Sequence, residues 1–425
     1  MKKIIAMLLV LAMALSLVAC GGGEKAPETQ APQAGTEAPA TEAAPEAITL
    51  KVWAPQEDQV DENSWLIQVQ KAFEEAHPEY VITWDNGVCP EGDAATMVTA
   101  DPAAAADVYM YANDQLGTLI QAGALAKLGG SYLEQVQADV SATYVNTVTA
   151  TDGGVYGFPV APNTWFMYYD KSVLTEEDVK TLEGVMAKGK VAFEIKNSWY
   201  LPSFFFAAGG SLFGETGSDA AAGIQFGGEA GYAATNAILD LMENPNFVVD
   251  GDGFGNNGVK NPDDDVIAYF SGSWDYAGLF EALGENLGAV AAPTVTINGE
   301  AAQLKAYAGS KAIGVNPNAK NMKAAMQFAA FLASADSQLL RFQLRNITPA
   351  VTALGENAEV AASIVAAAES ATMAYASVAQ PTIAEMNPVW GPVGTFGTNI
   401  ADGMVTRDNV VESVDAFHAQ LNGGL

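Results

Sequence analysis

Residues 107–127 read Asp-Val-Tyr-Met-Tyr-Ala-Asn-Asp-Gln-Leu-Gly-Thr-Leu-Ile-Gln-Ala-Gly-Ala-Leu-Ala-Lys. The run Val108–Ala112 is short, apolar and aromatic, which favours a buried parallel strand. Asn113 and Asp114 interrupt the run and are residue types that cap helices. Apolar residues then recur at helical spacing over Gln115–Ala122. The stretch therefore predicts a strand, a polar turn and a helix in direct succession.

This turn is a candidate binding site. Its polar cluster consists of Tyr111, Asn113, Asp114 and Gln115, which fall where the carboxyl end of the strand meets the helix. Ligands of open α/β sheets bind outside the carboxyl ends of the strands. The alternative, for this unit taken alone, is that Asp114 only caps the helix and Tyr111 only packs in the core.

Strands and helices alternate along the rest of the chain. Strand patterns fall at Ile48–Trp53, Tyr80–Trp84, Gly154–Val160, Trp165–Asp170, Val266–Phe270 and Lys305–Val315. Helical patterns fall at Trp65–Ala76, Leu174–Lys188, Glu229–Glu243, Ala324–Ala333, Ser337–Leu344, Ala358–Ser370 and Asn409–Leu421. The alternation predicts an α/β fold with mostly parallel sheets flanked by helices.

Residues 1–19 have the pattern of a signal peptide. Lys2 and Lys3 precede an almost wholly apolar run, and Leu-Val-Ala-Cys at 17–20 matches the lipobox of bacterial lipoproteins. An ordinary signal peptide and a single transmembrane helix are the alternatives. The apolar run is short for the roughly 20 residues that a membrane span needs, so we expect the signal to be removed and Cys20 to be lipidated.

The segment after the lipobox predicts a tether. Residues 20–47 are mainly Ala, Pro, Glu, Thr and Gly and contain no aromatic residue, so they are expected to be disordered. The remainder is long enough for two domains. The chain of 425 residues has 19 basic and 50 acidic residues, a formal charge of −31. Such a chain does not bind nucleic acid through phosphate contacts and is repelled by anionic lipid heads. The lipid anchor is therefore expected to hold it at the cell membrane, facing outward, on the surface of a Gram-positive cell or the periplasmic side of a Gram-negative one.

Few residues offer catalytic or metal chemistry. Apart from the lipobox cysteine, Cys89 is the only thiol, so the sequence predicts no internal disulfide and no cysteine metal site. The only histidines, His77 and His418, are far apart, and no phosphate-binding or dinucleotide-binding glycine motif occurs. The acidic loops at 250–254 and 263–265 lack the spacing of an EF-hand and are interpreted as solvated. No cofactor or metal is expected.

Several of the seven tryptophans fall at strand ends or in polar turns. Trp53 ends the first strand close to Glu57, Trp274 follows Ser-Gly-Ser, and Trp390 lies between two prolines. A flat aromatic ring covers the apolar face of a sugar. Carboxylates and amides satisfy the sugar hydroxyls, because an unpaired buried polar group costs about 1–3 kcal/mol. The pattern favours an uncharged carbohydrate ligand, and core packing is the alternative for any single tryptophan.

Five motifs, in order, resemble the maltose/maltodextrin-binding proteins, the family 1 solute-binding components of ABC sugar importers. They are Leu-Lys-Val-Trp at 50–53, the stretch 107–127, Gly-Val-Tyr-Gly-Phe-Pro-Val-Ala-Pro-Asn-Thr at 154–164, Ser-Gly-Ser-Trp at 271–274 and Gln-Pro-Thr-Ile-Ala-Glu-Met-Asn-Pro-Val-Trp at 380–390. The resemblance extends over most of the chain from residue 48 onward.

Together with the polar cluster, the resemblance implies eleven ligand-binding residues: Trp53, Glu57, Tyr111, Asn113, Asp114, Gln115, Asn163, Asn197, Trp199, Trp274 and Trp390. Tyr111, Asp114 and Gln115 stand where the family has Trp, Asp and Arg. Asn163 and Asn197 stand where it has acids, and Asp58 stands where its best-known members have a lysine. These departures leave the stacking surfaces in place and change several polar contacts.

The resemblance further implies a two-lobed, periplasmic-binding-protein-like fold of type II, with a ligand cleft between lobes joined by three crossings. The N-terminal lobe would hold residues 48–161 and 309–347, and the C-terminal lobe residues 162–308 and 348–425. The implied protein is a monomer and not an enzyme. It would bind maltose to maltodextrins and deliver them to the permease subunits of an importer.

Other functions stay open on the sequence alone. The ligand could be another oligosaccharide, or a polyamine or other cationic solute, since such sites also combine aromatics with carboxylates. The amides Gln115, Asn163 and Asn197 argue against a cation. A glycoside hydrolase would need two cleft carboxylates about 5–9.5 Å apart, and a passive adhesin would show no closure of the lobes.

Overall fold

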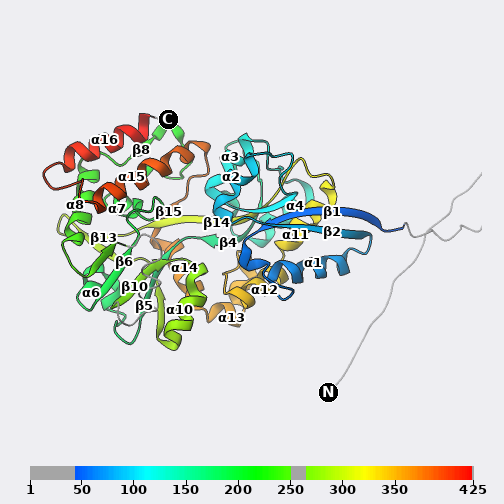
Figure 1. The fold of residues 1–425 in the computed structure, drawn as a ribbon, viewed down its shortest axis with the longest axis horizontal. Coiled ribbons are helices and arrows are strands. Elements are labelled where there is room, and N and C mark those ends of the chain that lie inside the picture. Colours follow the sequence, from blue (N-terminus) through cyan, green and yellow to red (C-terminus); the bar gives the residue numbers. More distant parts are fainter. Residues whose placement is uncertain (1–43, 250–264, 424–425) are drawn as a thin grey trace, which may run out of the picture. The chain divides into compact units, whose positions relative to one another are not determined.

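Two large β-sheets organise the computed structural model, which describes residues 44–249 and 265–423. The first sheet has the order β15-β14-β3-β1-β2, with β4 paired to β14, and the second has the order β11-β5-β10-β6-β9. In Figure 1, β14 and β4 lie in the middle, between the other strands of the first sheet and the strands of the second. Residues 45–425 form one compact unit that contains both sheets. This unit has its own hydrophobic cores, as an independently folding domain requires.

The strands of the first sheet are β1 (Glu46–Ala54), β2 (Tyr80–Val88), β3 (Val108–Ala112), β4 (Phe158–Asn163), β14 (Ala306–Val315) and β15 (Ser377–Ala379). Those of the second are β5 (Phe166–Asp170), β6 (Lys190–Phe193), β9 (Phe247–Val249), β10 (Val266–Ser271) and β11 (Leu287–Val290). Two small hairpins pair β7 (Ser211–Leu212) with β8 (Ile224–Gln225) and β12 (Thr294–Ile297) with β13 (Glu300–Gln303).

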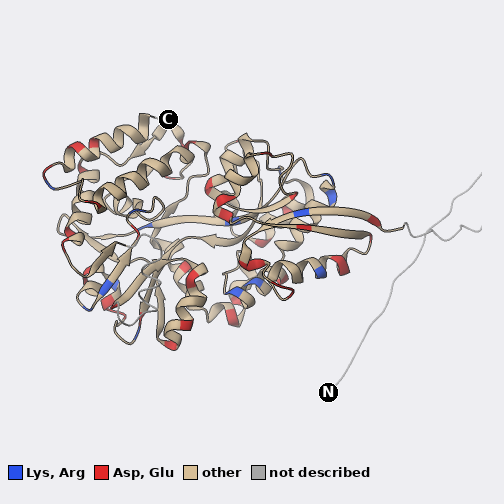
Figure 2. Ribbon diagram, in the orientation of Figure 1, with Lys and Arg blue, Asp and Glu red and all other residues tan. Residues whose placement is uncertain are grey.

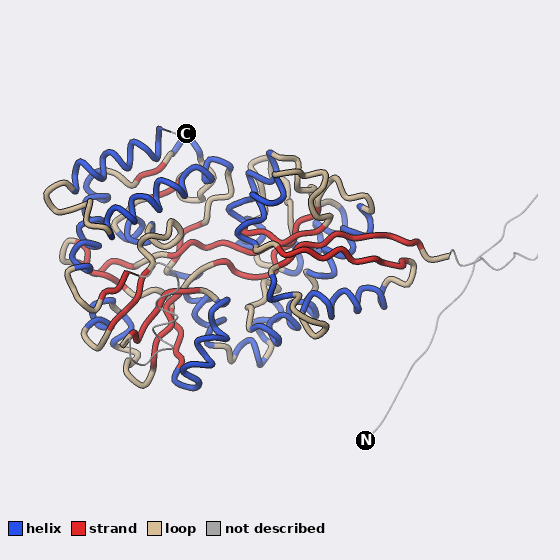
Figure 3. Tube along the Cα trace, viewed as in Figure 1, coloured by secondary structure: helices blue, strands red, loops and turns tan. Residues whose placement is uncertain are grey.

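Both large sheets are mixed, and five of the nine strand pairings in the described residues are parallel, including β14 with β15. β1 pairs in parallel with β2 and β3, and β6 with β9 and β10. β14 runs antiparallel to β3 and β4, and β5 runs antiparallel to β10 and β11. Figure 3 shows the strands of β4 and β14 as long traces through the middle of the described chain.

The helices packed around the first sheet are α1 (Trp65–Ala76), α2 (Ala94–Thr99), α3 (Leu116–Gln121), α4 (Gly130–Asp139), α5 (Ala142–Thr147), α11 (Met322–Leu332) and α12 (Ala335–Arg345). The other helices are α6 (Leu182–Met186), α7 (Pro202–Ala207), α8 (Gly228–Met242), α10 (Tyr276–Leu283), α13 (Ala358–Ala361), α14 (Ile364–Tyr375), α15 (Trp390–Ala401) and α16 (Val410–Gly423). None of the described helices is both long and apolar enough to span a membrane.

Each sheet has its own core. The core of the first sheet is formed by residues within 48–160 and 312–350. The second sheet has a large core, formed by residues within 165–307 and 383–421, and a smaller one on its other face. The strand β5 is mostly apolar because its alternate residues are buried in two different cores. Met167 and Tyr169 face the large core, whereas Phe166 and Tyr168 face a smaller core with α14. A strand buried on both faces needs apolar residues at every position.

β14 belongs to both cores. Ala306 and Tyr307 pack in the core of the second sheet, and Ala312 and Ile313 pack in that of the first. Ala350 also packs in the first core, although the predicted boundary assigns it to the C-terminal lobe. Acidic residues are scattered over helices and loops around both sheets (Figure 2), as expected for an acidic, solvated protein.

The structure shows that one predicted long helix is wrong. The predicted helix Leu174–Lys188 is a 3₁₀ turn at Asp178–Lys180 followed by the short α6. The interruption lies at Thr181, whose extended backbone ends the turn and whose Oγ1 accepts a hydrogen bond of 2.9 Å from Gly184 N. Thr181 is thus an N-cap, which starts a new helix rather than continuing one. The helix α15 was not among the predicted elements.

Candidate functional site

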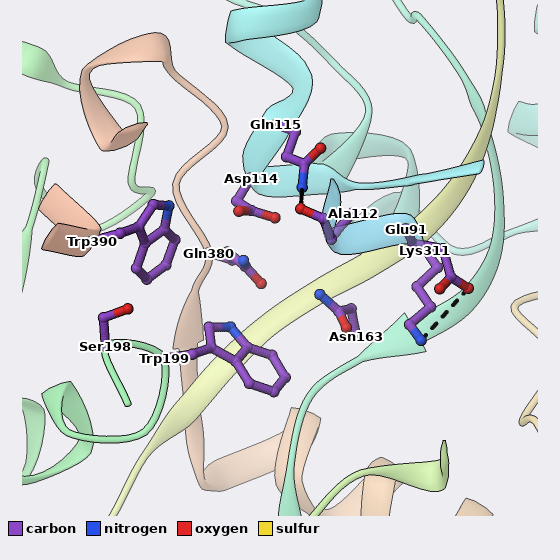
Figure 4. Close-up of a pocket in the computed structure, with 11 residues that line it drawn as sticks. Glu91, Ala112, Asp114, Gln115, Asn163, Ser198, Trp199, Lys311, Gln380 and Trp390 are labelled. Atoms are coloured by element: carbon purple, nitrogen blue, oxygen red, sulfur yellow. Dashed lines mark hydrogen bonds and ion pairs between the residues drawn. The ribbon is translucent and has the colours of Figure 1, made fainter. Parts of the chain in front are cut away.

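A cavity of about 270 Å³ opens where β3, β4, β14 and the segment after β15 meet. Its walls are formed by Glu91, Gly92, Ala112, Asp114, Gln115, Asn163, Ser198, Trp199, Lys311, Gln380 and Trp390. Figure 4 shows Trp390 and Lys311 at opposite ends of this group, with Trp199, Asn163 and Gln380 between them. Five of the eleven predicted residues therefore meet in one place: Asp114, Gln115, Asn163, Trp199 and Trp390.

Asp114 supplies a carboxyl group to the cavity. It lies in the 3₁₀ turn η3 (Asn113–Gln115), which follows β3 as the strand–turn–helix pattern predicts. Burial raises the pKa of Asp114 from 3.8 to about 6, and a hydrogen bond to its own backbone opposes the rise only partly. The group is thus a carboxylate at neutral pH that loses its charge in mildly acidic solution.

The neighbours of Asp114 in η3 are committed to the backbone. Gln115 Oε1 accepts from Ala95 N at 2.6 Å, and its Nε2 donates to Gly92 O. Asn113 is fully buried, and its Oδ1 accepts from Ser310 N at 2.9 Å. Gln115 still lines the cavity, but both ends of its amide hold the loop around Gly92 in place. Asn113 does not line it.

Tyr111 belongs to the core. It has no exposed surface, and its hydroxyl donates to Tyr156 O at 3.4 Å. Burial raises the pKa of this hydroxyl far above its ordinary value. A ring without exposed surface cannot stack on a ligand, so the predicted stacking role of Tyr111 does not fit its position and is corrected here.

Two residues predicted from the first strand lie away from the cavity walls. Trp53 is half-buried, and Lys51 Nζ lies 5.6 Å from its ring centroid. Glu57 is exposed in the turn Gln56–Asp58. The structure does not bring either side chain to the cavity.

Trp199 is positioned by its neighbour. Asn197 is exposed, its Nδ2 donates to Glu194 Oε2 at 2.7 Å, and its Oδ1 accepts from Trp199 N at 2.9 Å. Asn197 therefore fixes the loop that carries Trp199 rather than lining the cavity itself. Trp390, the first residue of α15, meets the Tyr307 ring edge-on at 5.9 Å between centroids.

Trp274 lies just outside the cavity wall. Its ring centroid is 5.9 Å from that of Trp199 and 5.1 Å from Lys311 Nζ. A Cβ added to Gly272 would lie 2.1 Å from Trp274 Cζ3, so the indole needs a glycine beneath it. This requirement explains why a glycine precedes the Ser-Trp pair in the motif.

Sequence reasoning missed Lys311, Glu91, Ser198 and Gln380 as lining residues. Lys311 had a signal, because it is the one charged residue within the otherwise apolar or small-residue strand β14. Gln380 had none. Its Oε1 is buried and has no hydrogen-bond partner among the described residues. A Cβ at Gly309 would lie 2.4 Å from this oxygen, so only glycine there admits Gln380.

A buried ion-pair network lies behind the cavity. Arg341 Nη2 is 2.6 Å from Asp58 Oδ2 and 3.2 Å from Glu91 Oε1, and Arg345 Nη1 is 2.8 Å from Asp58 Oδ1. Lys311 Nζ is 3.6 Å from Glu91 Oε1. Burial alone would raise the pKa of Glu91, but Lys311 and Arg341 outweigh it and lower the pKa to about 2. Asp58, where the family has a lysine, is thus part of the core and not a ligand contact.

A second buried carboxyl group lies on α14. Glu369 is 1% exposed, and neither of its oxygens has a hydrogen bond of good geometry within the described chain. Burial raises its pKa from 4.5 to about 7, and the nearby hydroxyls of Thr348 and Ser273 and the charge of Lys311 offset this only in part. Glu369 lines a separate cavity and is not a wall of the first.

The arrangement suits binding rather than catalysis. Two indoles present flat apolar surfaces, and two carboxylates, one of them paired with Lys311, and three amides lie beside them. No group of three or more His, Cys, Asp or Glu side chains in the described parts is placed to hold a metal ion. Cys89 is buried, and burial, with Asp93 and Glu91, raises its thiol pKa to about 11. Cys20 and most of the acidic residues at 250–265 lie outside the described residues.

Fold and site together define a two-lobed α/β binding protein with its ligand cavity beside the strands that join the sheets. Residues 68–368 match the family described as bacterial extracellular solute-binding protein, and the chain belongs to this family. The predicted family and the predicted fold class are confirmed, and the family is one of binding proteins rather than enzymes.

Three relatives show how far the similarity extends. A galactooligosaccharide-binding protein of Bacillus subtilis (strain 168) is 25% identical, over 97% of this chain and 96% of its own. A maltooligosaccharide ABC transporter solute-binding lipoprotein of Streptococcus pneumoniae (strain ATCC BAA-255 / R6) is 26% identical, over 89% and 87%. A solved structure described as being with acarbose is 46% identical, covers 89% of this chain and 99% of its own, and has a TM-score of 0.85.

Proposed function

We propose that this protein is the substrate-binding lipoprotein of an ABC carbohydrate importer and that it binds maltose and maltooligosaccharides. The observation that carries the proposal is the pairing of Trp199 and Trp390 with Asp114 and Gln380 around one cavity. Indoles stack on the apolar faces of pyranose rings. The Asp114 carboxylate accepts hydrogen bonds from sugar hydroxyls, which would otherwise be buried unpaired, and the Gln380 amide adds a polar group to the cavity wall.

The relatives support an α-glucan. One is named as a maltooligosaccharide-binding lipoprotein, and the structure described as being with acarbose is 46% identical to this chain. The Bacillus subtilis relative favours a second candidate, a galactooligosaccharide. A polyamine or other cationic solute is less well supported, because Glu91 is already paired with Lys311 and Asp114 is the one other carboxylate among the residues that line the cavity.

Calorimetric titration of residues 45–425 tests the ligand. We expect saturable binding of maltose, maltotriose and longer maltodextrins near micromolar, which is about −8 kcal/mol. Galactooligosaccharides and spermidine are titrated in parallel. Trp390→Ala should weaken α-glucan binding by roughly 2 kcal/mol or more, the scale of a buried aromatic hot spot. Binding of galactooligosaccharides alone would identify these as the substrate class instead of α-glucans. Absence of binding heat with every sugar would refute carbohydrate binding.

We also propose that ligand closes the protein. Residues 48–161 with 309–347 would move against residues 162–308 with 348–425, about the segments that join the sheets. A ligand that contacts both lobes shifts the equilibrium toward the closed form by its differential affinity. The closed form would then dock on the permease subunits. Small-angle scattering with and without maltotriose tests closure, and an unchanged radius of gyration would count against it.

Membrane attachment is proposed through a lipid on Cys20, with the protein facing outward. The lipobox and the name of the pneumococcal relative support it. Cys20→Ala in the full chain should release the protein from the membrane fraction into the medium or periplasm, while wild-type protein stays with the membranes. Equal partition of both forms would refute the anchor.

A further inference from the structure

Lys311 lies at the end of the cavity that is opposite Trp390 (Figure 4). It extends from β14, and its Nζ is 5.1 Å from the centroid of the Trp274 ring. Cations prefer this position over an indole face, within about 6 Å of the centroid. Lys311 and Trp199 both line the cavity, whereas Trp274 does not. The ring centroid of Trp274 is nevertheless only 5.9 Å from that of Trp199.

The lysine is held from a second side. Glu91 Oε1 is 3.6 Å from Lys311 Nζ, and the Lys311 and Glu91 side chains are only 14% and 9% exposed. Glu91 stays ionised throughout the neutral range because Lys311 and Arg341 hold its pKa near 2. A carboxylate from the side of the first sheet and an indole from the side of the second thus fix one ammonium group between them.

We infer that Lys311 is a specificity-determining residue that limits the length of the bound oligosaccharide by covering the Trp274 indole. The inference rests on the proposed function. Rings that stack on Trp390 and Trp199 need no movement of Lys311. A further ring that extends past Trp199 reaches a third indole only by displacing the ammonium group. The protein therefore prefers short oligosaccharides more strongly than its three tryptophans would by themselves.

The same contacts make Lys311 replaceable. Glu91 keeps Arg341 Nη2 at 3.2 Å when the lysine charge is removed. Lys311→Met preserves the length and apolar stem of the side chain and removes only the charge that favours the indole face. A lysine with a merely structural role would alter stability on this substitution and leave the preference for sugar length unchanged.

The test is calorimetric titration of residues 45–425 with maltose, maltotriose, maltotetraose and maltohexaose. We expect Lys311→Met to raise the affinity for maltohexaose relative to maltose by about fivefold, equivalent to about 1 kcal/mol. Lys311→Arg, which keeps a cation over the ring, should keep the wild-type ratio. Lys51→Met is the matched control, because Lys51 Nζ lies 5.6 Å from the Trp53 ring but away from the cavity.

A double mutant assigns the gain to the indole. Adding Trp274→Ala to Lys311→Met should abolish the fivefold rise, whereas Trp274→Ala alone should change the affinity for maltose by less than about twofold. A thermal melt of each variant confirms folding, and Lys311→Gln replaces Lys311→Met if the latter does not fold.

The outcomes separate the two proposals. A wild-type chain that binds no α-glucan overturns the proposed function, and this inference with it. A wild-type chain that binds α-glucans while Lys311→Met keeps the same length preference overturns the inference alone. So does a length shift that persists when Trp274 is replaced by alanine.

Discussion

β3 and β10 both end in a 3₁₀ turn that leads directly into a helix, η3 (Asn113–Gln115) into α3 and η6 (Ser273–Asp275) into α10. In η3, the outer two side chains hydrogen-bond to backbone and the middle one, Asp114, lines the cavity. In η6, the middle residue is Trp274, which is covered by Lys311. The same local structure therefore places a carboxyl group at the cavity in one case and an indole beneath a lysine in the other.

The comparison shows what supports each turn. In η3, Gln115 donates a hydrogen bond to Gly92 O, and the adjacent Glu91 forms an ion pair with Arg341. η6 has Glu369, a buried carboxyl group without a charged partner at hydrogen-bond distance in the described structure, behind Ser273. The first turn is supported by a buried ion-pair network. The second has a buried group that titrates, Glu369, and a hydrogen bond of 2.6 Å from Ser271 Oγ to Asp275 Oδ2. Each can be broken separately.

Arg341→Met should have the largest effect, on the support of η3. Arg341 is 3% exposed and pairs with two buried carboxylates, so its loss removes the shortest ion pair of each and leaves Asp58 only Arg345 and Glu91 only Lys311. We expect the free energy of unfolding to fall by about 3–5 kcal/mol in urea titration. Arg407→Met, which breaks exposed pairs with Asp240 and Glu243, is the control and should change little. Similar losses in both variants would contradict a special role for the buried network.

Glu369→Gln should reveal the titrating support of η6. The folded protein keeps the Glu369 proton up to about pH 7, whereas the unfolded chain releases it near 4.5. The unfolded state therefore binds fewer protons in this window, and wild-type stability falls as pH rises from about 4.5 to about 7. The total is roughly 3 kcal/mol at about 1.4 kcal/mol per pKa unit.

Unfolding of wild type and Glu369→Gln in urea at pH 4.5, 6 and 8 measures this difference. The variant should gain stability relative to wild type as pH rises, with the gain complete by about pH 8. Glu359→Gln, an exposed glutamate on the neighbouring α13, serves as control. A stability difference that is independent of pH would contradict the raised pKa.

Gln115→Ala tests the commitment of η3 to backbone hydrogen bonds. It leaves Ala95 N and Gly92 O without their side-chain partner. We expect a loss of about 2 kcal/mol in unfolding free energy, from the desolvation of two unpaired backbone groups. Gln56→Ala, at an exposed glutamine in the first 3₁₀ turn, should be neutral. A variant that keeps wild-type stability and loses only sugar affinity would instead make Gln115 a direct ligand contact.

Asp114→Asn should have the smallest effect, confined to ligand binding. Under the proposed function, the Asp114 carboxylate accepts hydrogen bonds from sugar hydroxyls above its pKa of about 6 and accepts fewer when protonated. Wild-type affinity for maltotriose should therefore decline as pH falls from 7.5 to 5. The variant should bind about tenfold more weakly at pH 7.5, with a flat pH profile. Parallel pH profiles for the two proteins would remove Asp114 from the binding site.

Sequence patterns located both turns and most of the elements around them. The apolar run of β3, the break at Asn113 and the spacing after it are local properties, and so they predicted the strand, turn and helix. The patterns did not show which side chain of a turn faces a ligand. Tyr111 is buried because Tyr156 and Gly157 lie against it, far away in sequence.

The missed residues have the same physical origin. Gln380 and Glu91 reach the cavity from segments almost 300 residues apart. Glu91 stands in none of the quoted motifs, and the motif at 380–390 does not by itself show that Gln380 reaches the same cavity as Trp390. Lys311 was identifiable as a charge within an apolar strand, but its two partners are not predictable from that strand. The prediction of one helix over Leu174–Lys188 was wrong because Thr181 caps a new helix there, and a hydrophobic pattern does not detect a capping residue.

The burial of Cys89 has a practical consequence. Residues 45–425 contain no other cysteine, and this thiol is fully buried with a pKa near 11, so it reacts slowly with thiol-directed reagents. Spin labels or fluorophores can therefore be placed on a pair of introduced surface cysteines, one on each side of β14, without altering the native residue. Distances between such labels would report ligand-driven motion in solution directly.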